Sequence, residues 1–460
     1  MTQSRRLSSW RRIGAVAALA MVWLVCPLML AAAELPEGWR TTDDTRRVPL
    51  PPRDDSQDPV LVIDGGTLID GTGGKPVPDS RVVIRGTHIV AAGARDEVPM
   101  PDRVDAEVDA GGLFVVPGLI DLHIHFTQQR GDDFGRYRDS AAAAAIRGTL
   151  LAKQLIDAGI TAVRDVGTSD DVALRIKEAV HRGMIDGPRV LWSGRMISSR
   201  GGHGNEITST ATGRPKSLED GARKRVANGP WDWRLAVREQ LRMHADWIKI
   251  TAPYTREEVQ AAADEAHMHG FRVAVDSFGK YTAWASEAGI DTIEHPLKLD
   301  SDIIDVMADN GTAFVPTITA FYNVLTTGYP TAGISGGGFF HTHSRRFPTN
   351  HEQHIQMVRE AHEAGVPIGV GTDIPFENER RYPGSYHREL GFLKDAGMSD
   401  EEVLAAATRV GADILGLPDK LGTVEDGKLA DILIVGADPL DDIQNLRDVR
   451  HVIANGRKIR

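Results

Sequence analysis

Cysteine is almost absent from this chain, and its one cysteine, Cys26, lies inside an apolar N-terminal segment. The remaining residues therefore hold no disulfide framework and no thiolate nucleophile. A metal site among them has to be built from histidine, aspartate, glutamate or a chemically modified lysine.

An excess of positive charge is also lacking. The 460 residues include 53 lysines and arginines against 64 acidic residues, which gives a net charge of −11 at pH 7. This balance argues against nucleic acid or an anionic membrane surface as the main partner. With 41% apolar and 25% charged residues, the composition is that of a folded globular protein, long enough for one large domain and a smaller one.

The N-terminus has the composition of an export signal. Four arginines precede an apolar stretch from about residue 13 to 30, which ends in three alanines at 31–33. This order predicts a signal peptide over 1–33 and an exported protein, periplasmic or extracellular. Because the apolar stretch is long for a signal, an uncleaved anchor that would tie the protein to a membrane is the alternative.

Short strand patterns occupy both ends of the remaining chain. A polar, proline-rich linker is predicted over 34–58, glycine-broken apolar runs follow in 59–117, and the same texture returns in 417–460. Such segments can pair into one small domain. We therefore expect a β-sandwich made of these two halves, with residues 118–416 inserted between them.

Residues 118–416 alternate between strand-like and helical patterns, and glycines stand where the helices should end. This alternation predicts a (β/α)8 TIM barrel. A doubly wound open sheet is the alternative, but no glycine-rich dinucleotide fingerprint follows the first strand. The strand-like segments are GLIDLHIHF (118–126), GITAVRDVG (159–167), PRVLWSGRMI (188–197), DWIKITAP (246–253), FRVAVDSFG (271–279), GIDTIEHP (289–296), TAFVPTITA (312–320) and VPIGVGTDIP (366–375).

The segment GLIDLHIHF ends with His123 and His125 on alternate positions. Side chains of a strand alternate between its faces, so the two imidazoles point to the same side. Two converging imidazoles are costly to bury unless a partner binds them, and a metal ion suits both. Two hydrogen-bonded core histidines are the alternative.

Further polar residues stand at the ends of the other strand-like segments. In a barrel, the C-terminal ends of the strands meet at one mouth, where the chemistry gathers. We therefore predict that potential ligands from several segments converge there on a metal. The residues at these ends are Arg164, Asp165, Lys249, Asp276, His295 and Asp373.

Lys249 and Asp373 call for separate explanations. A protonated lysine cannot bind a metal, but carbamylation by CO2 turns it into a carboxylate that can bridge two ions. The alternative is a buried lysine that pairs with Asp276 or Asp373. Asp373, in the sequence GVGTD, is placed to act as the general base beside the metal, whereas the alternative is a helix N-cap.

These motifs resemble the amidohydrolase superfamily, in particular its imidazolonepropionase-like and Xaa-Pro dipeptidase-like branch. The resemblance covers roughly residues 59–455 and is carried by VVPGLIDLHIHF, GITAVRDVGT, GGHG, ADWIKI, AGIDTIEH, GVGTDIP, GSYHRELGFLKDAGMS, AATRVGADILGL and LGTVEDGKLADILIVGADPL. It implies a metal-dependent hydrolase of amide-type bonds, in a dipeptide or a cyclic amide. Metal-bound hydroxide would attack the carbonyl carbon, with Asp373 shuttling the proton.

The resemblance also implies a ligand set for one or two divalent ions, usually zinc. His123, His125 and Asp373 would hold the first ion, Lys249 as a carbamate would bridge, and His295 would hold the second. The chain departs from the branch where His-Ala-His or His-Ala-Tyr is usual, because it has Asp276, Ser277 and Phe278 there. Aspartate can bind zinc, so we expect Asp276 to be a ligand. The alternative is that it pairs with a basic group and only one metal binds.

Four further residues are candidates for contacting a small-molecule substrate. His203 resembles a family position in a glycine-flanked loop, Tyr254 and Tyr322 follow strands, and Arg345 lies in a long glycine-rich segment and could grip a carboxylate. Plain loop surface is the alternative for His203 and Arg345. Other functions left open are deamination, cleavage of a lactone or guanidine, and a catalytically degenerate barrel used for binding. A homo-oligomer is left open as well.

Overall fold

The computed structural model describes residues 56–127, 140–168, 170–200, 202, 224–296, 299–327, 350–373 and 383–460. Residues 54–460 form one compact unit. No helix in the described ranges is long and apolar enough to cross a membrane. The expected signal peptide, most of the linker, His203 and Arg345 lie outside the described residues. The expectations for them stay predictions.

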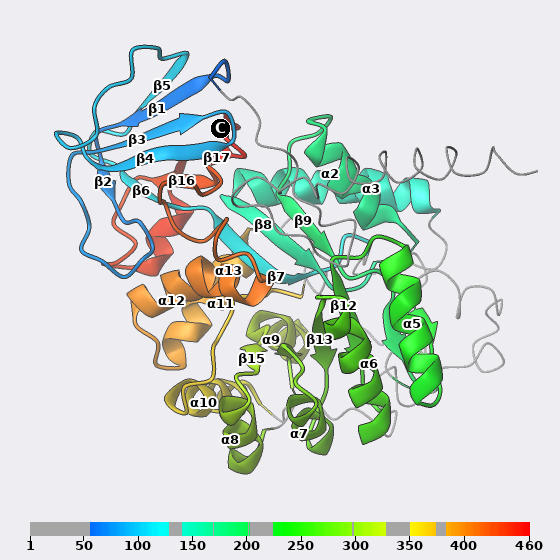
Figure 1. The fold of residues 1–460 in the computed structure, drawn as a ribbon. Coiled ribbons are helices and arrows are strands. Elements are labelled where there is room, and N and C mark those ends of the chain that lie inside the picture. Colours follow the sequence, from blue (N-terminus) through cyan, green and yellow to red (C-terminus); the bar gives the residue numbers. More distant parts are fainter. Residues whose placement is uncertain are drawn as a thin grey trace, which may run out of the picture. The chain divides into compact units, whose positions relative to one another are not determined.

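Two sheets in which every pairing is parallel make up the centre of the fold (Figure 1). The first has three strands in the order β7-β8-β9, and the second has six in the order β11-β10-β12-β13-β14-β15. Their bounds are β7 (Leu119–Ile124), β8 (Ile160–Asp165), β9 (Arg189–Trp192), β10 (Met196–Ser198), β11 (Lys224–Val226), β12 (Trp247–Thr251), β13 (Arg272–Asp276), β14 (Thr292–Glu294) and β15 (Ala313–Val315).

Backbone hydrogen bonds link the two sheets. Phe314 of β15 forms a parallel bridge with Ile368, and the amide of Leu122 in β7 donates to the carbonyl of Val370 at 2.9 Å. At β9, the other edge of the three-stranded sheet, the amide of Asp246, just before β12, donates to the carbonyl of Trp192, the last residue of β9, at 2.6 Å. The segment 366–373 therefore lies between β15 and β7, although the regular strand expected there is reduced to one bridge.

The strand expected over 188–197 is interrupted. It forms β9 in one sheet and β10 in the other, because Gly194 between them has a left-handed backbone with φ of +70°. The side chain of Gln240 fixes this break, since its Oε1 accepts the amide of Arg195 at 2.7 Å. A left-handed residue cannot continue a strand, which explains the difference.

Helices separate the parallel strands, and their starts and ends follow the sequence signals. Thr255 and Glu258 form a capping box at the start of α6. The glycines expected to end helices, at 159, 270, 289 and 365, all have positive φ, which confirms that prediction. The helices are α2 (Ala141–Asp157), α3 (Val172–His181), α5 (Pro230–Arg242), α6 (Arg256–Met268), α7 (Lys280–Glu287), α8 (Ser301–Asp309), α9 (Ile318–Thr327), α10 (His351–Glu363), α11 (Gly384–Asp395), α12 (Asp400–Ala407) and α13 (Arg409–Leu415).

Both faces of the parallel strands are buried. Ile248, Val273 and Ile293 belong to a large cluster that also contains helix residues such as Val259. Residues of alternate position on the same strands, with Trp247 among them, belong to a separate cluster. Strands covered on both faces are typical of parallel α/β folds, and the polar side chains at their ends are thereby held in a fixed direction.

The N-terminal and C-terminal segments share a sheet, as the strand patterns predicted. β16 pairs antiparallel with β6 in a sheet of order β18-β17-β16-β6-β2, and Figure 1 shows the orange-red β16 beside the cyan β6. A second sheet has the order β4-β3-β1-β5. The boundaries proposed for the domains stay predictions. These strands are β1 (Val60–Asp64), β2 (Thr67–Leu68), β3 (Ser80–Arg85), β4 (His88–Ala94), β5 (Ala106–Asp109), β6 (Phe114–Pro117), β16 (Ile432–Val435), β17 (Val449–Ala454) and β18 (Arg457–Lys458).

Candidate metal centre

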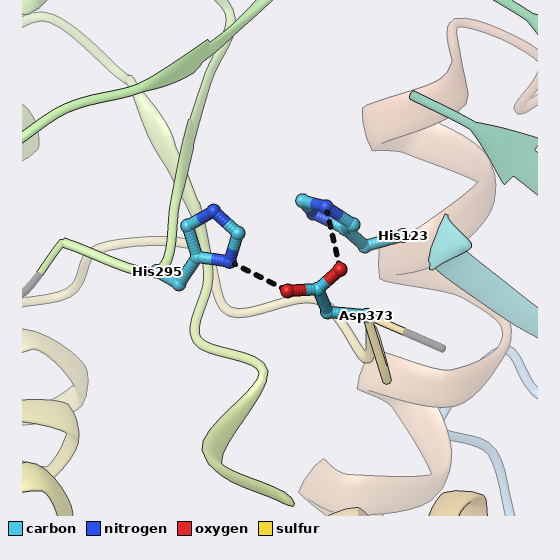
Figure 2. A group of neighbouring side chains, drawn as sticks. All are labelled: His123, His295 and Asp373. Carbon is cyan, nitrogen blue, oxygen red and sulfur yellow. Dashed lines mark ion pairs between the residues drawn. The ribbon is translucent and has the colours of Figure 1, made fainter. Parts of the chain in front are cut away.

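Three segments far apart in the sequence bring imidazoles to one carboxylate. The Oδ1 atom of Asp373 lies 3.2 Å from Nε2 of His125 and 3.6 Å from Nε2 of His123. Its Oδ2 atom lies 3.5 Å from Nδ1 of His295. Figure 2 shows Asp373 between His123 and His295. The convergence expected at the strand ends is therefore present for these four residues.

The carboxylate and imidazoles are held away from water. His123 is 1% exposed, and His125, His295 and Asp373 are at most 5% exposed. His295 and Asp373 both have positive φ, of +36° and +49°. Left-handed backbone at a residue other than glycine is strained and is concentrated at functional sites. Three of the residues, His123, His295 and Asp373, offer ligand atoms that all lie within 4.8 Å of one another.

Asp276 and Lys249 complete the group from the neighbouring strands β13 and β12. The Oδ2 atom of Asp276 lies 3.4 Å from Nε2 of His295. Lys249 is 1% exposed, and its Nζ atom makes no hydrogen bond to any described residue. Burial lowers the pKa of Lys249, although the negative charges of Glu294 and Asp276 oppose that shift.

The nitrogen and oxygen atoms of this group are spaced like the ligands of a divalent metal ion, and several of them make no hydrogen bond. Besides Lys249 Nζ, His295 Nε2 and Asp373 Oδ1 are buried polar atoms without a hydrogen bond in the described part of the chain. Ligands about 2.0–2.1 Å from a tetrahedral zinc ion lie roughly 3.3 Å from each other. The separations of 3.2, 3.6 and 3.4 Å between imidazole and carboxylate atoms agree with that spacing.

Glu294 and Arg164, behind the centre, orient His123. Oε2 of Glu294 lies 2.6 Å from Nδ1 of His123, and Oε1 accepts from Nη2 of Arg164 at 2.6 Å. All three side chains are at most 1% exposed. Burial would raise the pKa of Glu294, but the positive charges of Arg164 and Lys249 hold it below its usual range. The ionised carboxylate takes the Nδ1 proton of His123 as a hydrogen bond, so Nε2 keeps its lone pair toward the centre.

The other two imidazoles are oriented in the same manner. Nδ1 of His125 lies 2.9 Å from the carbonyl oxygen of Gly167, which can only accept, so the proton is on Nδ1 and Nε2 faces Asp373. Nδ1 of His295 lies 3.1 Å from Oγ1 of Thr317. Burial and the charge of Lys249 lower the pKa of His123 to about 3, so this ring is neutral at neutral pH, as a metal ligand must be.

Asp121 ties Asp373 to β7. Its Oδ2 atom accepts from Oγ1 of Thr372 at 2.7 Å, and its Oδ1 atom accepts the amides of Thr372 and His123 at 3.1 Å. The amide of Asp373 donates to the carbonyl of His123 at 2.7 Å. Because these bonds join the two segments, Asp373 and His123 keep a fixed position relative to each other.

Sequence reasoning missed the roles of Asp121 and Glu294. Asp121 precedes His123 by two positions, so the same period-two reading that paired the histidines could have included it. Glu294 directly precedes His295 in an apolar run, and a carboxylate there requires a buried partner. Nothing in the sequence around Glu294 indicates that these partners are Arg164 and His123.

Two of the expected substrate contacts are described. Tyr254 is buried, and its hydroxyl donates to the carbonyl of Tyr281 at 2.8 Å. Tyr322 packs its ring 5.0 Å from His351 and 5.2 Å from Phe392, on α10 and α11. These packing partners explain both positions, and a substrate role for either residue stays a prediction.

Several known proteins are similar to this chain in sequence and fold. Residues 114–459 match the amidohydrolase family. Ochratoxinase from Aspergillus niger is 26% identical over 435 residues, covering 86% of each chain. The crystal structure of a Xaa-Pro dipeptidase with bound methionine in the active site has 30% identity and a TM-score of 0.75, over 87% of this chain and 99% of that one. A prolidase complexed with N-methylphosphonate-L-proline has 27% identity and a TM-score of 0.75, over 87% and 99%.

These similarities extend over both the parallel strands and the centre at their ends. The α/β part of the chain is accordingly of the TIM-barrel type, and the His/His/Asp group is compatible with a metal. The chain belongs to the amidohydrolase family and is a hydrolase that acts on carbon–nitrogen bonds.

Proposed function

We propose that this protein is an exported metal-dependent amidohydrolase that cleaves an amide bond in a dipeptide or a cyclic amide. The observation that carries the proposal is a group of buried polar atoms that could bind a metal and that make no hydrogen bond to the described residues. They are Lys249 Nζ, His295 Nε2 and Asp373 Oδ1. A protein does not bury such atoms together without a compensating partner, because each costs free energy when unsatisfied.

Six residues would hold the metal. His123, His125 and Asp373 form one donor set, and His295 and Asp276 begin a second. Lys249 would join them as a carbamate: its neutral amine attacks CO2, a carbon–nitrogen bond forms, and one proton leaves. The buried Nζ atom without an acceptor supports this modification. When bound, a divalent metal, zinc by preference, lowers the pKa of a water ligand and polarises a carbonyl oxygen.

Asp373 would move the proton. It accepts a proton from the attacking water and delivers it to the departing nitrogen, as a general base and then a general acid. Its amide bond to His123 and the link from Thr372 to Asp121 hold its carboxylate in place during this exchange. Glu294 keeps the Nε2 lone pair of His123 toward the centre, where a bound metal would occupy it and leave the proton to Asp373.

A dipeptide with a free C-terminal carboxylate is the substrate class that the solved relatives favour. One of them holds methionine in its active site, and another holds N-methylphosphonate-L-proline, which carries an amino-acid carboxylate. Arg345 stays our candidate for gripping that carboxylate, and His203 for a further substrate contact.

Two structural features belong to the same proposal. A closed ring of eight strands is supported by the backbone bonds that link 366–373 to β15 and β7, and Asp246 to Trp192. A β-sandwich of the two terminal halves is supported by the pairing of β16 with β6 and by a buried cluster that contains Ile84, Val115 and Ile432. Export rests on the signal-like composition of residues 1–33.

The proposal is tested by counting bound metal and screening substrates. The protein is purified with zinc and bicarbonate, its metal content is measured, and release of amino acids from a dipeptide panel is followed. We expect bound zinc, a carbamate signal in the 13C NMR spectrum after labelling with 13C-bicarbonate, and cleavage of some dipeptides. Ammonia release without a new amino acid would indicate a deaminase. Protein without metal and without turnover of any amide would refute the proposal.

A further inference from the structure

The two donor sets of the centre differ in chemistry. The first contains two imidazole nitrogens and one carboxylate oxygen, from His123, His125 and Asp373. The second contains one imidazole, from His295, together with the carboxylate of Asp276 at 3.4 Å and the amine of Lys249. As a carbamate that joins both sets, Lys249 would give each set a second oxygen donor, so the second set would hold one imidazole where the first holds two.

Asp276 is fixed in the second set by its strand. It is the last residue of β13, where it is paired in register with Thr251 on one side and Glu294 on the other. Its side chain is buried, with 5% of the residue exposed. The pairing fixes the backbone from which this carboxylate extends, and the carboxylate lies 3.4 Å from Nε2 of His295, so its charge would act on an ion bound there.

Ligand type decides which metal a site selects. Imidazole suits zinc, copper, iron and nickel, whereas carboxylate and water oxygens suit magnesium, calcium and manganese. Selectivity follows donor type and geometry rather than raw affinity, because almost any site binds zinc more tightly than manganese. The ratio of zinc to manganese affinity should therefore be lower for the second set than for the first.

From this asymmetry we infer that the centre is a mixed one, in which the His123–His125–Asp373 position takes zinc and the Lys249–Asp276–His295 position takes a harder ion such as Mn²⁺. The inference rests on the proposed metal-dependent function and adds to it the identity of the second ion. Asp276 is the residue that sets this preference, since a histidine at 276 would give the second position a second imidazole.

The test reads metal content and the spectrum of the ion, without using activity. The full chain is stripped with a chelator, reloaded with two equivalents of Zn²⁺ per chain, Mn²⁺ in large excess and bicarbonate, and desalted, because only an excess of manganese can offset the general preference for zinc. Both metals are counted by mass spectrometry, and bound Mn²⁺ is observed by electron paramagnetic resonance. We expect one zinc and one manganese per chain, and anomalous diffraction should place the manganese beside His295.

Three variants separate the two positions. In Asp276→His, zinc should replace manganese, and the manganese-to-zinc ratio should fall by about tenfold or more, because the donor set becomes imidazole-rich. Asp276→Asn is similar in size but neutral, and it should lose manganese without gaining zinc. His125→Asn should lose zinc and retain the manganese spectrum. If Asp276→His does not fold, the opposite responses of the other two variants still decide the matter.

The outcomes distinguish this inference from the proposed function. Asp276→His is expected to retain two zinc ions and no manganese. The same result for the wild-type protein would overturn the inference but would agree with a zinc-dependent amidohydrolase. Manganese placed between His123 and His125 would overturn it too. Protein that retains neither metal would overturn both.

Discussion

Replacement of Glu294 by glutamine is the perturbation that tests the support behind the centre most directly. The side chain is fully buried, and its oxygens serve two nitrogen donors, Nη2 of Arg164 and Nδ1 of His123, each at 2.6 Å. Oε1 also accepts from Oγ1 of Thr292 at 2.6 Å. Glutamine has the same shape but only one acceptor oxygen. Whichever way the amide turns, its NH2 group faces one of the two donors.

The magnitude follows from what is left unpaired. Arg164 is fully buried and would keep only neutral acceptors, the carbonyl of Leu122 at 2.7 Å and Oγ1 of Thr292 at 3.1 Å. Removing one partner of a buried charge pair costs about 3–5 kcal/mol, so we expect the free energy of unfolding to fall by about that amount. If the NH2 group faces His123, the ring must carry its proton on Nε2 and loses its lone pair toward the metal. Loss of such outer partners costs about 10–100-fold in metal affinity.

The assay is urea unfolding of stripped protein, together with zinc titration against a competing chelator. Glu265→Gln is the matched control. Glu265 is also buried, but its two arginine partners, Arg238 and Arg234, have side chains that are 61% and 27% exposed and can be solvated after the change. This control should cost less than about 1 kcal/mol and leave zinc affinity unchanged. An unfolding midpoint and zinc affinity equal to wild type in Glu294→Gln would refute our account of how His123 is oriented.

Three further changes test other parts of the structure. Lys249→Met should leave the free energy of unfolding equal or higher, because it removes a buried amine without an acceptor. Metal content and dipeptide turnover should fall, and unchanged turnover would contradict a ligand role for Lys249. Thr372→Val removes the hydroxyl that donates to Asp121. It should lower the free energy of unfolding, measured in urea, by about 1–3 kcal/mol because a buried acceptor loses its donor, and no change would show that water replaces the hydroxyl. Burial raises the pKa of Glu389 to about 7, so the folded state holds its proton more tightly than the unfolded state and wild-type stability falls as pH rises from about 4.5 through 7. Relative to Glu389→Gln, this loss should reach about 3 kcal/mol, and parallel stability curves for the two proteins would contradict it.

The sequence by itself determined the local features of this protein. Capping residues and glycines set the helix ends, because a cap such as Thr255 with Glu258 acts within one turn of chain. Apolar runs set most of the parallel strands, and the repeated strand texture at both termini set their pairing, seen in β6 and β16. The residue types at the strand ends identified His123, His125, His295 and Asp373 as one group of candidate ligands, since parallel strands carry their C-terminal residues to the same side.

The tertiary structure alone decided how those residues are held and used. Glu294 meets His123 across 171 positions of sequence, and no period of two or 3.6 residues encodes so distant a pairing. Gly194 broke an expected strand because Gln240, on α5, binds the chain there. Local patterns fix which side chains a segment presents, whereas the partner of a buried charge is chosen only when strands far apart in sequence pack, because only then is water removed and a partner required.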